Sequence, residues 1–254
     1  MVLASLLVVR VEAQSVLFDF DSLTGTGLPT AYTVGGITAS FSATAPGFSI
    51  QLADTMGFTP AGFAGKCIYP NSINAADLLV SFSAPLTDFS ILYATQELSC
   101  DDSATMRVTA YMNGTPVGTN TATTNCIDIP CNWTPNTLSI TTTQAFNNVV
   151  VHYATRPPTC QNWGPIFMAD NMTVTPMPPI ILANLTKLTN GAFQFTFTNL
   201  TNWPFTVWGT TNLSLPFSNW ATLTGLTEAP PGQYQFTDLQ ATNLPQRFYR
   251  VTSP

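Results

Sequence analysis

Three aspartates have the chemistry of a cation site. Two of them lie near the start of residues 14–176, and the third lies near the end. Asp19 and Asp21 follow an apolar segment that starts at Val16, and Asp170 lies in a second apolar segment, 166–175. Carboxylate oxygens are ligands that Ca²⁺ prefers. If the two segments are neighbouring strands, Asp19, Asp21 and Asp170 come together, and we predict a calcium site there. In the alternative interpretation the aspartates only point outward while the phenylalanines beside them pack inward.

A second acidic group surrounds Cys100. Glu97, Asp101 and Asp102 place three carboxylates close together in the sequence. They suit a hard cation bound by a loop. They are equally typical of a solvated surface loop, and the sequence leaves both interpretations open.

Side chains suited to a polysaccharide are concentrated in two loops. One loop holds Gln161, Asn162 and Trp163, and the other holds Tyr69 and Asn71. An aromatic ring offers an apolar face on which a sugar can stack, and amides hydrogen-bond to hydroxyl groups. We predict that these five residues bind a polysaccharide or a cell-surface glycan. The competing interpretation is that Trp163 plugs the end of the fold.

Catalytic patterns are absent from the sequence. A glycosidase needs two carboxylates, yet Glu97 and Glu228, the two glutamates beyond residue 13, lie in different predicted domains. The chain has no GxSxG or HExxH motif, and its single histidine, His152, has no nucleophile at a known spacing. We therefore expect a non-catalytic protein in which His152 is a hydrogen-bonded strand residue, and we keep a hydrolase as the third-ranked function.

The charge pattern disfavours two classes of partner. Thirteen acidic residues outnumber seven basic ones, the formal net charge is −6, and no basic cluster occurs. Nucleic acids and anionic membranes both require concentrated positive charge. No later apolar run approaches the roughly 18 residues of a membrane span, so we expect no membrane insertion.

The first residues indicate export from the cell. Residues 1–13 form an apolar run in which Val11 and Ala13 have the small-residue spacing of a signal peptidase site. We interpret 1–13 as a signal peptide remnant and expect a secreted or cell-surface protein, with a plain first strand as the alternative.

The five cysteines fit an oxidising compartment. Cys126 and Cys131 are close enough in sequence to close a small disulfide loop. Cys100 and Cys160 each follow a predicted strand, and the two strands have similar sequences. If these strands run in the same direction, the two cysteines lie at one end of the fold and can pair. Cys67 is then left over, although exchanging it for one of these partners is also open.

Short β-branched and aromatic runs separated by turn residues predict an all-β fold. The strict alternation of 106–112, followed by Asn113-Gly114, indicates a hairpin. Runs at 78–82 and 89–93 flank Ala84-Pro85-Leu86-Thr87, which predicts a hairpin or a corner. The number of strands suits a jelly-roll-like β-sandwich for residues 14–176.

A proline-rich segment separates a second domain. Pro176, Pro178 and Pro179 favour a stiff linker. Beyond it no cysteine occurs, and five further strands are expected. We predict that residues 177–254 form a small immunoglobulin- or fibronectin-like β-sandwich.

The C-terminal part carries a pattern found elsewhere. It comprises Thr211-Asn212-Leu213, Trp220, Phe236-Thr237-Asp238 and Arg247-Phe248-Tyr249-Arg250. This pattern resembles the terminal β-sandwich module of secreted proteins of environmental Gram-negative bacteria. The resemblance implies that the protein is exported or displayed on the cell surface, and it implies no catalytic activity.

Residues 16–176 resemble a second group more loosely. Phe18-Asp19-Phe20-Asp21 in the opening strand and Asp170-Asn171 in the closing strand are similar to extracellular jelly-roll domains of exosortase-sorted (PEP-CTERM-like) bacterial proteins, although the sorting tail is missing. We expect a secreted, non-catalytic, glycan-binding protein. The alternative is a structural or adhesive protein of the cell surface or matrix that has no small ligand.

Overall fold

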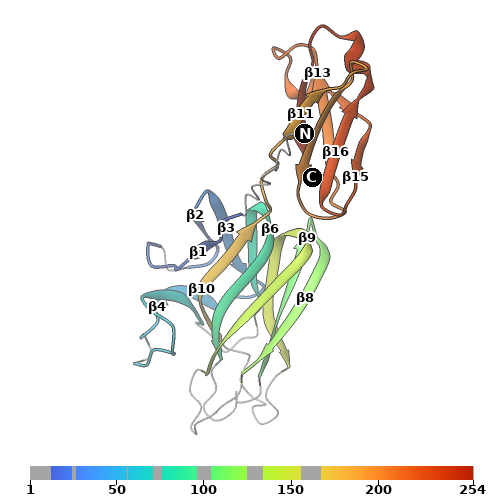
Figure 1. Ribbon diagram of the computed structural model, residues 1–254. Helices are drawn as coiled ribbons and strands as arrows, with labels where there is room; N and C mark the ends of the chain where they lie inside the picture. Colours follow the sequence, from blue (N-terminus) through green and yellow to red (C-terminus); the bar gives the residue numbers. More distant parts are fainter. Residues whose placement is uncertain are drawn as a thin grey trace, which may run out of the picture. The chain divides into compact units, whose positions relative to one another are not determined.

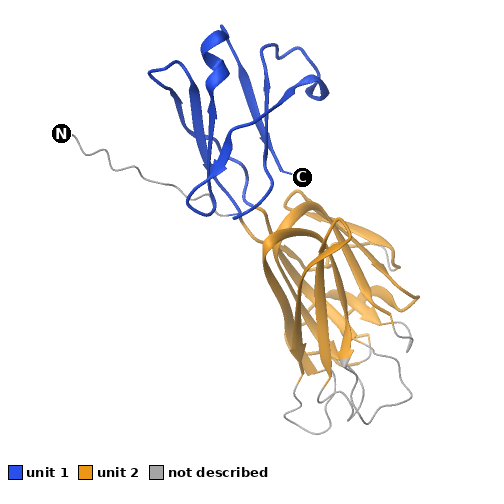
Figure 2. Ribbon diagram, turned by 90° about the vertical axis from the view of Figure 1, so that its right-hand side faces the viewer, with its two compact units in different colours: residues 1–13, 178–254 blue, residues 14–177 orange. Residues whose placement is uncertain are grey.

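The computed structural model describes residues 13–24, 27–55, 57–70, 76–95, 104–124, 134–155 and 167–253. In this part of the chain the regular elements are strands and two short 3₁₀ helices, so the protein is all-β as predicted. The chain forms two compact units, 14–177 and 178–254, which we call the N-terminal and C-terminal units (Figure 2). The predicted boundary lies one residue before this division. None of the described elements is a helix long and apolar enough to cross a membrane.

In the described residues of the N-terminal unit the chain forms ten strands, most of them labelled in Figure 1. They are β1 (Val16–Phe18), β2 (Thr30–Val34), β3 (Ile37–Ala43), β4 (Phe48–Leu52), β5 (Lys66–Pro70), β6 (Leu78–Thr95), β7 (Thr105–Met112), β8 (Thr115–Thr123), β9 (Thr134–Thr155) and β10 (Phe167–Pro176). Asn113 and Gly114 both have positive φ angles, 50° and 83°, which confirms the predicted β7–β8 hairpin.

Two long strands connect the two layers of this sandwich. The sequence predicted separate strands on either side of 84–87, but β6 runs through this segment without a break, so the corner interpretation is right and the hairpin is wrong. The pairing of β6 with β9 shifts register on both sides of Leu86, which allows both strands to bend there. Each strand therefore contributes its first half to one layer and its second half to the other.

Each layer has its own set of partners. The first half of β6 pairs with β3 and with the second half of β9, which continues to β7 and β8. The second half of β6 pairs with β10 and with the first half of β9. Inward side chains from both layers form one apolar core, with Phe41, Val80 and Val149 from the first layer and Phe89 and Ile140 from the second.

The connection from β4 to β5 covers part of the outer surface of the second layer. Ala53 and Phe63 of this connection pack with Cys67, Tyr69 and Met168 in a small buried cluster. The loop is thus fixed by burial of apolar surface, which stabilises it against opening. This cover decides the environment of several residues that the sequence had suggested as ligands.

The C-terminal unit contains seven strands in two sheets, in the orders β11-β12-β16-β15 and β14-β13-β17. They are β11 (Ala183–Lys187), β12 (Phe193–Thr198), β13 (Thr206–Thr210), β14 (Ala221–Leu223), β15 (Leu226–Glu228), β16 (Gln233–Asp238) and β17 (Phe248–Thr252). The five predicted strands are present, and β11 and β15 were missed. The core contains Phe195, Phe197, Val207, Tyr234 and Phe236, as expected for a small β-sandwich.

Candidate functional site

Of the three aspartates predicted to bind calcium, Asp170 and Asp21 hold the end of the loop that precedes β5. Asp170 in β10 is 1% exposed and accepts hydrogen bonds from the amides of Ala64 (3.2 Å) and Asn171 (2.7 Å). Asp21 accepts one from the amide of Lys66, at 2.6 Å. Asp170 and Asp21 therefore satisfy backbone donors at the end of the β4–β5 loop, which is a structural task.

Asp19 has a different partner. Its Oδ1 accepts hydrogen bonds from the Tyr32 hydroxyl (3.0 Å) and from the amide of Asp21 (3.3 Å). Within the described residues, no three His, Cys, Asp or Glu side chains gather closely enough to hold a metal ion. Calcium at Asp19, Asp21 and Asp170 stays a prediction, and the ion would compete with backbone and side-chain donors for the same oxygens.

Burial dominates the electrostatics beneath the loop. It raises the pKa of Asp170 to about 6, and the charges of Asp21 and Asp19 add to the rise while the two backbone amides oppose it. Cys67 is fully buried, and burial followed by the Asp170 charge raises the pKa of its thiol to about 12. Cys67 is a free cysteine, so the alternative in which it replaces a disulfide partner is wrong.

One residue of the predicted sugar site has an environment that corrects its assignment. Tyr69 is 8% exposed and packs under the β4–β5 loop with Phe63 and Cys67. Its ring is therefore not available for stacking on a sugar, because alternation along β5 turns it towards a surface that the loop covers.

Other predicted site residues fall outside the described residues. They are Gln161, Asn162, Trp163 and Asn71 of the sugar site, Glu97, Asp101 and Asp102 of the acidic group, and Cys100, Cys126, Cys131 and Cys160 of the disulfides. These assignments stay predictions. The strand ends that flank them gather at one end of the sandwich, where Thr95 pairs with Thr134 and Phe167, and Thr105 pairs with Thr155.

The outer surface of the first layer forms a continuous polar face. Register aligns Ser40 of β3 with Ser81 of β6, Ser81 with Asn148 of β9, and Asn148 with Tyr111 of β7. The two serines are exposed, and Asn148 and Tyr111 are half-buried. Hydroxyl, amide and phenol groups thus follow one another across four neighbouring strands. We call this surface the polar face, and its other members used below are Asp77, Leu79, Arg107, Thr109, Val150 and His152.

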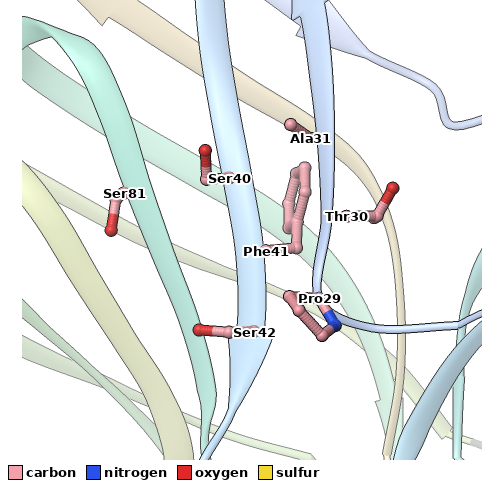
Figure 3. Close-up of a pocket in the computed structure, with 7 residues that line it drawn as sticks. All are labelled: Pro29, Thr30, Ala31, Ser40, Phe41, Ser42 and Ser81. Carbon is pink, nitrogen blue, oxygen red and sulfur yellow. The ribbon is translucent and has the colours of Figure 1, made fainter.

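One edge of the polar face is hollowed. An open hollow of about 480 Å³ is lined by Pro29, Thr30, Ala31, Ser40, Phe41, Ser42 and Ser81 (Figure 3). In this view the hydroxyl groups of Ser40 and Ser81 stand on adjacent strands, while Phe41 belongs to the core and is 1% exposed. The hollow therefore offers hydroxyl groups at its rim and apolar surface within it.

The charged groups of the polar face lie on β7, on β9 and just before β6. Arg107 Nε donates to His152 Nε2 at 2.6 Å, and His152 Nδ1 lies 3.8 Å from Asp77 Oδ1. Burial lowers the pKa of His152 and the charge of Arg107 lowers it further, against the opposing charge of Asp77. His152 is thus held neutral, with Nε2 as acceptor and its proton on Nδ1. It is a hydrogen-bonded residue on a strand surface, as predicted.

Sequence reasoning did not identify the polar face. The alternation of 106–112 already separates Arg107, Thr109 and Tyr111 from the buried Met106 and Val108. That pattern predicts which side chains share a face of one strand. It contains nothing about Ser40, Ser81 or Asn148, because their register with β7 arises from pairing between distant segments.

Comparison with known proteins concerns the fold. The sequence matches no protein-family model, and the search of curated proteins found no match. The K2 cleaved adhesin domain of Lys-gingipain is 12% identical, with a TM-score of 0.43, over 64% of this chain and 99% of that domain. The CBM51-2 and INT domains of Clostridium perfringens ZmpB are 11% identical, with a TM-score of 0.33, over 59% of this chain and 40% of that chain.

The similar structures also include enzymes. The MgGH51 α-L-arabinofuranosidase is 12% identical, with a TM-score of 0.37, over 65% of this chain and 27% of the enzyme. Because one fold hosts many functions, a function must come from the site.

Proposed function

We propose that the N-terminal unit is a non-catalytic, extracellular glycan-binding module and that the polar face is its contact surface. The observation that carries the proposal is the aligned row of Ser40, Ser81, Asn148 and Tyr111 across four strands. Sugar hydroxyl groups are both donors and acceptors, and they need partners of both kinds. Hydroxyl and amide side chains supply such partners without a charge.

Apolar surface between the polar groups completes the site. Leu79, Val150 and Thr109 form the next row of the same face, and the first two are half-buried aliphatic side chains. A sugar ring presents C–H groups on its faces, which pack on such surface. The tyrosine of the row adds a ring with a polar tip.

The acidic groups of this face support binding without turnover. Hydrolysis of a glycosidic bond requires two carboxylates across a groove. The described part of the polar face carries one, Asp77, and its Oδ1 faces His152. The extracellular location is supported by the signal-like residues 1–13 and by the two resemblances to exported bacterial proteins.

A glycan array probed with residues 14–254 tests the proposal, followed by titration of any hit. Asn148→Ala and Tyr111→Ala should each weaken binding by about 1 kcal/mol, a factor of roughly five to ten. Ser139→Ala is the matched control, because Ser139 is exposed on the outer surface of the other layer. Absence of binding, or an equal loss in the control, would overturn the polar face as the site. A chelator arm tests the calcium prediction separately.

One observation favours the structural or adhesive alternative. The C-terminal unit exposes Leu213, Leu215 and Phe217, and the Phe217 ring contacts Trp208 and Trp220 at centroid distances of 5.1 and 5.7 Å. Exposed apolar patches often mark contact surfaces. If residues 14–254 bind no glycan but self-associate, and Leu213→Ser with Leu215→Ser abolishes the association, this alternative is supported.

A further inference from the structure

Arg107 lies in a strongly acidic unit, yet it forms no ion pair with any described residue. Residues 14–177 contain ten acidic and three basic residues. Within the described part of the chain, Asp238 forms an ion pair with Arg247, Asp77 faces the neutral His152, and no carboxylate pairs with Arg107. Its place in mid-strand β7 keeps its stem half-buried among the side chains of the polar face.

The hydrogen bond to His152 decides which edge of the guanidinium is free. A guanidinium group has five donors in a planar fork. Nε is used by His152 Nε2, at 2.6 Å. The two terminal nitrogens remain, and they form the edge that recognises a planar oxyanion through two parallel hydrogen bonds.

The groups around Arg107 allow an anion to approach. The neighbours in register are His152 on β9 and Thr121 on β8, both uncharged, since the imidazole is neutral. Asp77, the nearest described carboxylate, faces the far side of the imidazole through Nδ1. The histidine thus separates the negative charge from the guanidinium and leaves the guanidinium charge uncompensated.

We propose that the free edge of Arg107 binds an oxyanion of an acidic glycan, either a uronic acid carboxylate or a sulfate ester. This inference rests on the proposed glycan-binding function and names the class of glycan. Arg107 and Tyr111 are four residues apart on β7, a distance of about 13 Å along a strand. One oligosaccharide can therefore place its charged group on Arg107 and its hydroxyl groups on the row of Ser81, Asn148 and Tyr111.

His152 acts in this proposal as a positioning residue. It accepts the Nε proton and orients the fork, and it does not contact the ligand. A glutamine can accept the same proton through its side-chain oxygen, whereas an alanine cannot. His152→Gln should therefore retain the preference for acidic glycans and His152→Ala should lose much of it.

Three probes test the inference with residues 14–254. They are oligogalacturonate, its methyl-esterified neutral form, and a sulfated carrageenan oligosaccharide. The wild type should bind at least one acidic probe roughly tenfold more tightly than the neutral probe, and added salt should reduce the difference. The acidic probe that binds identifies carboxylate or sulfate as the source of the oxyanion.

Variants separate this inference from the function on which it rests. Arg107→Gln should remove the acidic preference and retain binding of the neutral probe, Arg107→Lys should keep part of the preference, and Arg250→Gln in the C-terminal unit is the control. Binding of all probes with no preference, or a preference that survives in Arg107→Gln, overturns the inference while the function stands. Absence of binding to any glycan overturns both. Thermal unfolding of each variant shows whether it is folded.

Discussion

Arg247 donates from Nη1 to Asp238 Oδ2 across 2.8 Å, and both side chains are almost fully buried in the C-terminal unit. The same carboxylate accepts a hydrogen bond from the Tyr249 hydroxyl at 2.9 Å and, through Oδ1, one from the amide of Gln240. The Phe-x-Asp and Arg-Phe-Tyr-Arg phrases of the sequence thus meet at one buried carboxylate. They form a hydrogen-bonded network within this unit that links the end of β16 to the start of β17.

Removing the basic partner should destabilise the C-terminal unit. Arg247→Met leaves Asp238 as a buried charge with fewer hydrogen-bond donors. The free energy of unfolding should fall by about 3–5 kcal/mol. The matched control is Lys187→Met, because Lys187 is an exposed basic residue of β11. Urea unfolding followed by tryptophan fluorescence reports on this unit through Trp203, Trp208 and Trp220. Equal midpoints for the two variants would contradict the structural role of the pair.

Gly65 should not tolerate a side chain. Its φ angle is +56°, and a Cβ atom built on it would lie 1.9 Å from Asp21 Oδ1, which binds the amide of Lys66. Gly36 has a φ angle of +79° and open space around the same position, so Gly36→Ala reproduces the backbone strain without the clash. We expect Gly65→Ala to be less stable than Gly36→Ala by roughly 2 kcal/mol in urea unfolding. If both variants lose a similar amount of stability, the Asp21 side chain moves aside without cost and the prediction is wrong.

Asp170 should make stability depend on pH. Its pKa is about 6 in the folded state and near 3.8 when unperturbed, so the folded state binds more protons between these values. Stability should therefore fall as pH rises from about 4 to about 6, by about 3 kcal/mol, and stay low above that range. Asp170→Asn should lack this slope.

Urea midpoints measured at several pH values check the Asp170 prediction. The wild type and Asp54→Asn, which removes an exposed carboxylate, should share the slope. If the difference between wild type and Asp170→Asn stays constant across the range, the titration is assigned to the wrong group.

Cys67 should be unreactive in the folded protein. Its thiol is fully buried, so a reagent cannot reach it. Its pKa is about 12, so the reactive thiolate does not form at neutral pH. Protein prepared without reductant should show no fast reaction with Ellman's reagent, and one thiol after unfolding if Cys126–Cys131 and Cys100–Cys160 are disulfides. Five thiols after unfolding would refute the disulfide prediction. Cys67→Ala should remove the single signal, and rapid reaction of native Cys67 would contradict its burial.

Local patterns were sufficient for several elements. The alternation of 106–112 and the Asn113-Gly114 turn predicted β7, its hairpin and the residues that share its outer face. Such features depend on side-chain period and on turn conformation, and both are encoded by adjacent residues. The same reasoning divided β6 into two strands, because a bend between layers resembles a turn in the sequence.

The predicted sites depended on distant contacts. Alternation could place Tyr69 on one face of its strand, but the β4–β5 loop covers that face, and only the folded chain shows this. Likewise, Asp21 and Asp170 were correctly expected near each other, while their hydrogen bonds to the amides of Lys66 and Ala64 depend on how this loop packs.

The sequence alone determined the all-β class, the acidic character and the residues that face outward on individual strands, because these follow from composition and from a two-residue period. The tertiary structure decided which of those residues become neighbours. It aligned Ser40, Ser81, Asn148 and Tyr111 in one row and set His152 beside Arg107. Strand register between distant segments is fixed by the packing of the whole core, so no single stretch of sequence contains it.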